Sequence, residues 1–220
     1  MFLCNDCILV IYVDDCLIFA EHDHTVDSLI QALSKSYLLQ DEGDVNAFLG
    51  VQIVKDPRTK NITLSQPSLI QQILHDVGIT NVSNGKETPV DAILYADSTR
   101  PEQQEKWNYR SVIGKLNYLA NNTRPDISMA VHQYAHFCTN PKAVHDRVVK
   151  QIAIYLLATA DKGLVLTPSL DMSLNMYVDA DFAGRWHREY AKLRDDVLSR
   201  TGYVTLFCNC PAIWGEQASK

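Results

Sequence analysis

Two adjacent aspartates, Asp14 and Asp15, interrupt an apolar stretch near the start of the chain. Residues 8–13 are aliphatic or aromatic, and residues 16–20 resume the apolar run after the pair. This pattern predicts a β-hairpin with both carboxylates at its tight turn. Carboxylate oxygens are preferred ligands of Mg²⁺, and two such ions a few ångströms apart can drive phosphoryl transfer. For an Asp-Asp pair taken alone, an acidic surface turn is the alternative.

A second acidic candidate follows an apolar segment near the other end of the chain. Residues 174–178 have a strand-like pattern, and Asp179 and Asp181 come directly after them. Taken without any other information, an Asp-Ala-Asp sequence after a strand is more often a turn than a metal site.

Cysteine and histidine pairs offer a third kind of chemistry, which is zinc binding. The candidate ligands stand at short spacings in three places: Cys4 and Cys7, Cys208 and Cys210, and His132 and His136 with Cys138 nearby. The two cysteine pairs lie at opposite ends of the chain, and the histidines fall on an amphipathic helical pattern. We therefore expect free thiols and a helix packed in the core rather than zinc ligands.

Length and composition set the protein class. The chain has 220 residues, of which 46% are hydrophobic and 21% charged, so it is globular and has room for one large domain or two small ones. Disordered, collagen-like and disulfide-rich classes are excluded. The longest apolar run, residues 7–13, is far shorter than the ~20 residues of a membrane span. The first residues lack the features of a signal peptide, so we expect a soluble intracellular protein with no membrane partner.

The charge distribution is uneven. The net charge is −6, which argues weakly against nucleic-acid binding, but residues 111–170 hold six basic and three acidic residues, a local net charge of +3. This excess suits a surface that faces a phosphate backbone. Ordinary helix packing with solvated lysine and arginine explains it equally well.

Hydrophobic periodicity places the remaining elements. One helical pattern begins at Asp23 or Thr25, and a second has Ser65 as its N-cap and ends at Gly78. Three more helices are predicted from apolar stripes over 109–119, 127–137 and 144–156. Strand patterns cover 48–54, 62–64, 164–166, 174–178, 203–207 and 212–214. Residues 56–61 form a polar turn, and the polar residues 80–106 are the best linker candidate.

The sequence Tyr12-Val13-Asp14-Asp15, between its apolar flanks, resembles the catalytic hairpin of reverse transcriptases. Further motifs follow in order and resemble the Ty1/copia class of long-terminal-repeat retrotransposons. They are residues 48–53, 64–66, 109–119, 123–127, 130–131 and 179–184. The series covers nearly the whole chain, and its order is far more specific than any single motif.

The resemblance implies an α+β fold. It comprises a partial reverse-transcriptase palm and thumb, a helical connection and an incomplete ribonuclease H-like sheet. The implied domains are 1–55 for the C-terminal part of the palm, 56–165 for the thumb and connection, and 166–220 for the start of ribonuclease H. Residues 164–216 should then form a mainly antiparallel sheet with one exposed apolar face, and Asp179 should lie near the end of a central strand.

The resemblance also implies the roles of the site residues. Asp14 and Asp15 would be catalytic ligands of Mg²⁺ in the polymerase, and Tyr12 and Val13 would lie beside the primer end and the incoming nucleotide. Asp179 would be the first metal-binding carboxylate of ribonuclease H, with Asp181 a weaker candidate. The partners would be an RNA template and a DNA primer, in a cytoplasmic virus-like particle or the nucleus.

The family sites need more carboxylates than these. The polymerase uses a third carboxylate on a strand ahead of the hairpin, and ribonuclease H uses acidic residues further downstream. We therefore expect a fragment of an RNA-directed DNA polymerase that binds Mg²⁺ weakly and does not polymerise DNA alone. The alternatives are a non-catalytic remnant that at most binds nucleic acid, and an unrelated metal-binding α+β protein.

Overall fold

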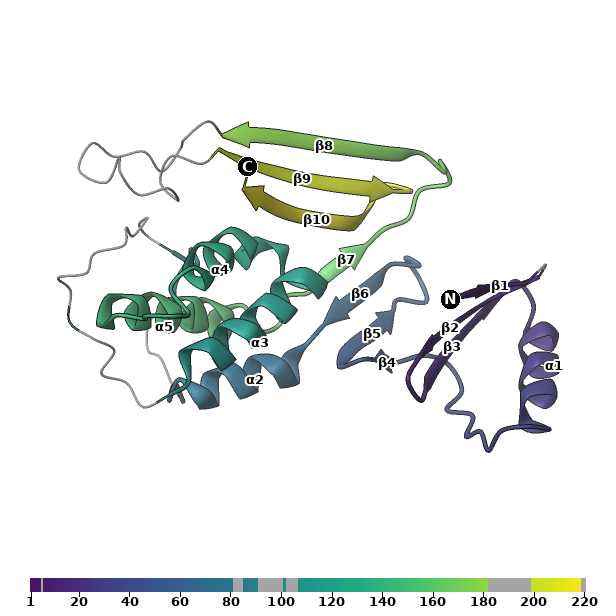
Figure 1. Ribbon diagram of the computed structural model, residues 1–220. Coiled ribbons are helices and arrows are strands. Elements are labelled where there is room, and N and C mark those ends of the chain that lie inside the picture. Colours follow the sequence, from purple (N-terminus) through teal and green to yellow (C-terminus); the bar gives the residue numbers. More distant parts are fainter. Residues whose placement is uncertain (5, 81–84, 91–100, 102–106, 182–198, 219–220) are drawn as a thin grey trace. The chain divides into compact units, whose positions relative to one another are not determined.

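The computed structural model describes the whole chain except residues 5, 81–84, 91–100, 102–106, 182–198 and 219–220 (Figure 1). The chain divides into two compact units, Met1–Leu49 and Gly50–Lys220. The described residues form five α-helices and three antiparallel sheets, which confirms a mixed fold of helices and strands. Most of the predicted linker lies outside the described residues.

The first unit is a three-stranded antiparallel sheet with one helix. Its strands, in the order β1-β2-β3, are β1 (Phe2–Leu3), β2 (Cys7–Tyr12) and β3 (Asp15–Ala20). Helix α1 (Asp23–Ser34) contacts β3 and starts after His22, so the predicted cap at Asp23 or Thr25 is wrong. Asp23 instead lies in the first turn, where an acid is favourable near the helix dipole. The short strand β4 (Ala47–Phe48) ends this unit.

The predicted hairpin over residues 8–20 is confirmed. The β2–β3 register runs without interruption from Cys7 opposite Ala20 to Tyr12 opposite Asp15. Cys7 and Leu9, on one face, are buried, whereas Ile8 and Phe19, on the other face, are 40% and 47% exposed.

The second unit contributes three neighbouring strands to a small sheet, β5 (Val51–Lys55), β6 (Ile62–Ser65) and β7 (Leu164–Leu166). The predicted polar turn over 56–61 is confirmed, because Oδ1 of Asp56 accepts the backbone N–H groups of Arg58 and Thr59 at its corner. The strand predicted over 48–54 is broken, because Leu49 and Gly50 both have positive φ. The expectation that 164–166 belongs to the C-terminal sheet is also wrong, because β7 pairs with β6.

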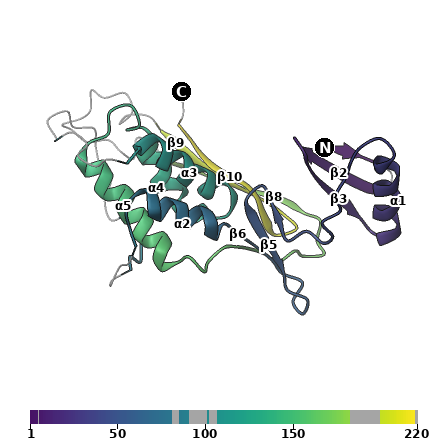
Figure 2. The same ribbon diagram turned by 90° about the horizontal axis from the view of Figure 1, so that it is seen from below.

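A bundle of helices forms the main core of the second unit (Figure 2). Its helices are α2 (Pro67–Asp76), α3 (Tyr109–Asn122), the short 3₁₀ helix η1 (Pro125–Ile127), α4 (Ser128–Ala135) and α5 (Ala143–Ala158). Apolar stripes at helical spacing meet there, including Ile73, Leu116 and Ile152, all fully buried. The predicted cap at Ser65 is wrong, because β6 extends through Ser65 and Gln66 caps α2 ahead of Pro67. Gly78 follows α2 with φ +72°, as the predicted helix end requires.

The C-terminal sheet consists of β8 (Leu174–Asp181), β9 (Arg200–Phe207) and β10 (Cys210–Ala218), in the order β10-β9-β8. Its exposed apolar face is confirmed by Leu174, Met176, Val178, Phe207 and Ile213, which are 43–71% exposed. On the side of the helices, the indole N–H of Trp214 donates to the carbonyl of Ala120 at 3.0 Å. The prediction of a central strand for Asp179 is wrong within the described residues. Strand β9 is central because it pairs with β10 on one edge and with β8 on the other.

No helix in the described part of the chain is long and apolar enough to cross a membrane.

Candidate active-site hairpin

The turn of the β2–β3 hairpin brings four of the predicted site residues together. Tyr12 and Asp15 are directly opposed, so Val13 and Asp14 form the two-residue turn between them. Val13 is 85% exposed and Tyr12 is 57% exposed, and both aspartates are exposed. Within the described residues neither carboxylate has a hydrogen-bond or ion-pair partner, so both present their oxygens to solvent.

The backbone of this turn is strained. Val13 has a φ of +55°, a value that is rare for any residue with a Cβ atom and exceptional for a β-branched one. Glycine usually takes the positive-φ positions of two-residue hairpin turns. Such strain costs about 1–3 kcal/mol and clusters at functional sites. The tip therefore has the backbone signature of a site as well as the carboxylates.

The faces of the hairpin fix what lies beside the aspartates. Directly opposed residues of an antiparallel pair share a face, so Tyr12 and Asp15 lie on the same face as Ile8 and Phe19. That face is apolar: Ile8, Tyr12 and Phe19 are exposed on it, Val10 and Leu17 are half-buried, and Asp15 stands at its end. This face of the hairpin therefore offers an apolar surface on which a flat group could lie, with a carboxylate at its end.

The remaining predicted ligands lie elsewhere. Asp179 is exposed on β8, in the second unit, opposite Gly202 of β9. The side chain of Asp181 lies outside what the structure describes. Within the described residues, no group of three or more histidine, cysteine, aspartate or glutamate side chains could hold a metal ion.

The zinc alternatives gain no geometric support. The rings of His132 and His136 meet edge to face, with centroids 5.7 Å apart. A guanidinium nitrogen of Arg200 lies 3.5 Å from Nε2 of His136, so a cation already occupies the space beside that ring nitrogen. The two cysteine pairs lie in different units, at the β1–β2 and β9–β10 turns.

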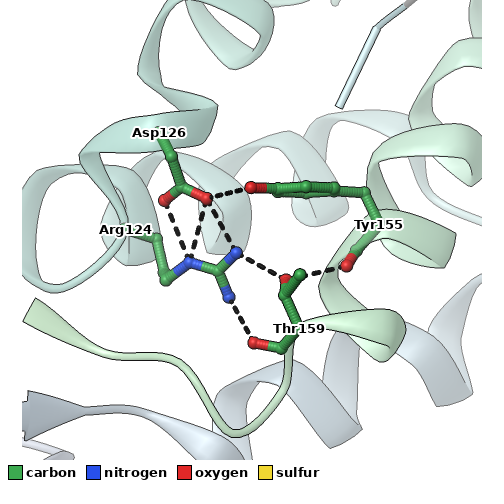
Figure 3. A network of polar contacts seen from close by, with 4 residues as sticks. All are labelled: Arg124, Asp126, Tyr155 and Thr159. Atoms are coloured by element: carbon green, nitrogen blue, oxygen red, sulfur yellow. Dashed lines mark hydrogen bonds and ion pairs between the residues drawn. The ribbon is translucent and has the colours of Figure 1, made fainter. Parts of the chain in front are cut away.

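A partly buried polar network surrounds Arg124, and it was not predicted from the sequence (Figure 3). The Arg124 side chain, 3% exposed, donates through Nε and Nη2 to the carboxylate of Asp126, at 2.9 and 2.8 Å. Its Nη1 and Nη2 also donate to the carbonyl and hydroxyl oxygens of Thr159, at 3.0 and 2.7 Å. The Tyr155 hydroxyl donates to Asp126 at 2.7 Å. This arrangement ties the start of η1 to the end of α5.

The network shifts the pKa values of its members. Burial alone would raise the pKa of Asp126, but hydrogen bonds from Arg124 and Tyr155 and the charge of Arg124 outweigh it, so that pKa lies below its usual value. Burial would lower the pKa of Arg124, and the contacts with Asp126 raise it instead. Burial and the hydrogen bond to Asp126 both raise the pKa of Tyr155. The network thus holds a charged pair at neutral pH.

Two more close contacts lie where the helices meet the β5–β6–β7 sheet. The hydroxyl of Thr123 donates to Oε1 of Gln66 at 3.0 Å, and both side chains are 1% exposed. A Cβ atom on Gly163 would lie 2.4 Å from the carbonyl oxygen of Leu64, so only glycine allows β7 to approach β6 there. The Thr123–Gln66 hydrogen bond thus ties the end of α3 to the start of α2, which follows β6 directly.

Comparisons with known proteins identify the class of this chain. Residues 2–92 match the family model described as reverse transcriptase (RNA-dependent DNA polymerase). The putative transposon Ty5-1 protein of Saccharomyces cerevisiae is 30% identical over 213 residues, which cover 96% of this chain and 66% of that protein. The retrovirus-related Pol polyprotein from transposon RE1 of Arabidopsis thaliana is 31% identical over 218 residues, 96% of this chain and 14% of the polyprotein.

A third relative is matched over most of its length. It is an uncharacterized mitochondrial protein of Arabidopsis thaliana, 30% identical over 176 residues that cover 80% of this chain and 72% of that protein. No solved structure matches. The chain belongs to the reverse-transcriptase-containing Pol polyproteins of copia-type retrotransposons and corresponds to one part of such a polyprotein.

Proposed function

We propose that Asp14 and Asp15 are metal-binding carboxylates of an RNA-directed DNA polymerase site. The observation that carries the proposal is the aspartate pair itself. It lies exposed at the tip of a strained apolar hairpin, inside the residues that match the reverse transcriptase family. Two unpaired carboxylates at one turn suit a hard cation such as Mg²⁺, which favours oxygen ligands.

Each residue at the tip has a separate role in this proposal. Asp14 and Asp15 would hold Mg²⁺, which supplies positive charge to the reacting phosphates. The strained turn at Val13 fixes the direction of the two carboxylates, and its exposed side chain would lie against the incoming nucleotide. Tyr12 shares a face with Asp15, so its ring would lie beside the primer end.

We extend the proposal to the rest of the chain by domain. Residues 1–55 would be the C-terminal part of the palm, 56–165 the thumb and connection, and 166–220 the start of ribonuclease H. The β5–β6 hairpin would grip the primer, and α2, which begins directly after β6, would be the first thumb helix. Asp179 would be the first ribonuclease H carboxylate, supported by its place near the end of β8.

An RNA template and a DNA primer would be the partners. The structure narrows down which of the six basic residues of 111–170 would contact their phosphates. Three of these six residues are already paired or buried within the protein. Lys115 pairs with Asp76 at 2.8 Å, Arg124 lies in the partly buried network, and Lys142 is 6% exposed. Of the other three, Arg147 and Lys162 are exposed, so phosphate contact would fall first on these two residues, fewer than the sequence implies.

The place of action would be a cytoplasmic virus-like particle or the nucleus. This part of the proposal rests on the Pol polyprotein relatives alone.

The test is primer extension by a chimera on an RNA template. Residues 7–20 of this chain replace the aligned hairpin in the Pol polyprotein from transposon RE1, with residues 1–92 exchanged in a second, larger chimera. The chimeras should extend the primer in Mg²⁺, and Asp14→Asn with Asp15→Asn should abolish extension. Asp41→Asn with Glu42→Gln, made in the larger chimera, is the matched control and should leave it unchanged. Extension that survives the Asp14 and Asp15 changes would contradict the proposal.

A further inference from the structure

Two cysteines flank the turn that joins β1 to β2. Leu3 lies opposite Ile8 and Phe2 opposite Leu9, so Cys4 and Cys7 are the next opposed pair along the hairpin. The N–H of Cys4 donates to the carbonyl of Cys7 at 2.9 Å. Hydrogen-bonded opposed pairs have Cα atoms about 5.5 Å apart, inside the roughly 4.4–6.8 Å span of disulfides. The backbone thus places the two cysteines on one face, with a Cα separation inside the range that a disulfide spans.

The two thiols differ in their access to solvent. Cys4 is exposed, whereas Cys7 is only 9% exposed. The hydrogen bond with Cys4 raises the pKa of Cys7, and burial and the nearby charges of Cys4 and Asp6 raise it further. An oxidant in solution therefore reaches Cys4 first, and Cys7 stands behind it as a protected thiol.

We propose that Cys4 and Cys7 form a redox-active dithiol that closes to an intrachain disulfide by exchange with a small-molecule disulfide such as oxidised glutathione. The Cys4 thiolate attacks one sulfur of the oxidant, forming a mixed disulfide and releasing one glutathione thiolate. The Cys7 thiol loses its proton and attacks the Cys4 sulfur, forming the Cys4–Cys7 bond and releasing the second thiolate. Both released thiolates take up the two protons, so two thiols are oxidised and one disulfide is reduced.

Oxidation would change the edge of the sheet that carries the aspartate pair. Strand β1 has only two residues, Phe2 and Leu3, and they are 60% and 71% exposed. Few contacts hold it in place, although it pairs with the edge of β2, the strand that ends at Tyr12. The disulfide would fasten β1 covalently along β2. This inference does not depend on the polymerase proposal.

The experiment is oxidation of the full chain followed by thiol mapping. The folded protein is treated with oxidised glutathione, denatured, alkylated and digested with trypsin. Residues 1–35 form one tryptic peptide with three cysteines, Cys4, Cys7 and Cys16. The expected peptide carries one alkyl group, on Cys16, and has lost two hydrogens, and dithiothreitol should restore three alkylated thiols.

Two variants and one condition make the result specific. Cys16→Ser should still lose two hydrogens, whereas Cys4→Ser should lose none and keep two thiols for alkylation. Closure in urea should be several-fold slower, because the hairpin no longer holds the thiols opposite each other. Three alkylated thiols, a stable glutathione adduct on Cys4, or equal closure rates in urea and native buffer would each overturn the proposal.

Discussion

Replacing Arg124 by methionine should destabilise the second unit by about 3 kcal/mol. Removing one partner of a buried ion pair costs roughly 3–5 kcal/mol. Water can rehydrate part of the carboxylate here, because the Asp126 side chain is 38% exposed, which lowers that figure. The carbonyl of Thr159 loses its Arg124 donor, and a buried acceptor left without a donor costs about 1–3 kcal/mol. Rehydration of Asp126 lowers the expected cost and the unpaired Thr159 carbonyl raises it, so the net loss of stability is about 3 kcal/mol.

Thermal unfolding followed by circular dichroism measures this loss. For a unit of this size, 3 kcal/mol corresponds to a fall in Tm of roughly 6–12 °C. Arg124→Lys should recover only part of the loss, because lysine keeps the charge without the planar set of donors. Arg110→Met, at an exposed position in α3, is the matched control and should shift Tm by little. A loss below about 1 kcal/mol for Arg124→Met would refute the structural role of the network.

The same variant gives a pH test. Folding lowers the pKa of Asp126, so its ionised form adds stability above its unfolded pKa of about 3.9. That stability is lost as the pH falls through the lowered folded pKa. The difference in unfolding free energy between wild type and Arg124→Met should therefore shrink below about pH 4. A difference that stays constant down to pH 2 would show that the ion pair does not carry the effect.

Three further predictions concern single positions, and a fourth concerns the activity of the chain alone. Gly163→Ala should lower the free energy of unfolding by at least about 1–3 kcal/mol, because its Cβ would meet the Leu64 carbonyl. Gly114→Ala, in open space on α3, should raise the free energy of unfolding by up to about 1 kcal/mol. Chemical denaturation measures both changes. Val13→Gly should stabilise the first unit by up to about 1 kcal/mol, as measured by urea denaturation. A loss of stability in this variant would show that the turn is unstrained. Tyr155→Phe should cost about 1 kcal/mol, less than Arg124→Met, and their double variant should fall short of the sum. The chain alone should give no primer extension, and extension that vanished with Asp14→Asn and Asp15→Asn would contradict this while supporting the carboxylates.

The sequence predicts the hairpin because its signals are local. Apolar runs on both sides of an aspartate pair specify two strands and a turn within fourteen or so residues. The positive φ of Val13 was not predictable, since a β-branched residue argues against that conformation. Only the paired register, closing on Tyr12 and Asp15, forces it.

Non-local pairings account for the two errors in strand placement. The place of Asp179 on an outer strand depends on which strands flank β9, and β7 joins β6 across the whole helical bundle. Periodicity carries no information on either choice. The Arg124 network could not be predicted for the same reason, because Thr159 lies 35 residues from Arg124 in the sequence. A basic and an acidic residue around Pro125, at the start of the 3₁₀ helix η1, were the only local signal.

Paramagnetic broadening by Mn²⁺ in the NMR spectrum of the chain tests most directly whether Asp14 and Asp15 hold the metal. Mn²⁺ accepts the same oxygen ligands as Mg²⁺. A titration should broaden the amide resonances of residues 12–16 first, with weak affinity, and Asp14→Asn with Asp15→Asn should remove this effect. The acidic segment 41–44 is the internal control and should broaden only at higher Mn²⁺. Equal broadening at both segments, or broadening at the hairpin that persists in the double variant, would contradict the assignment of a metal site to this turn.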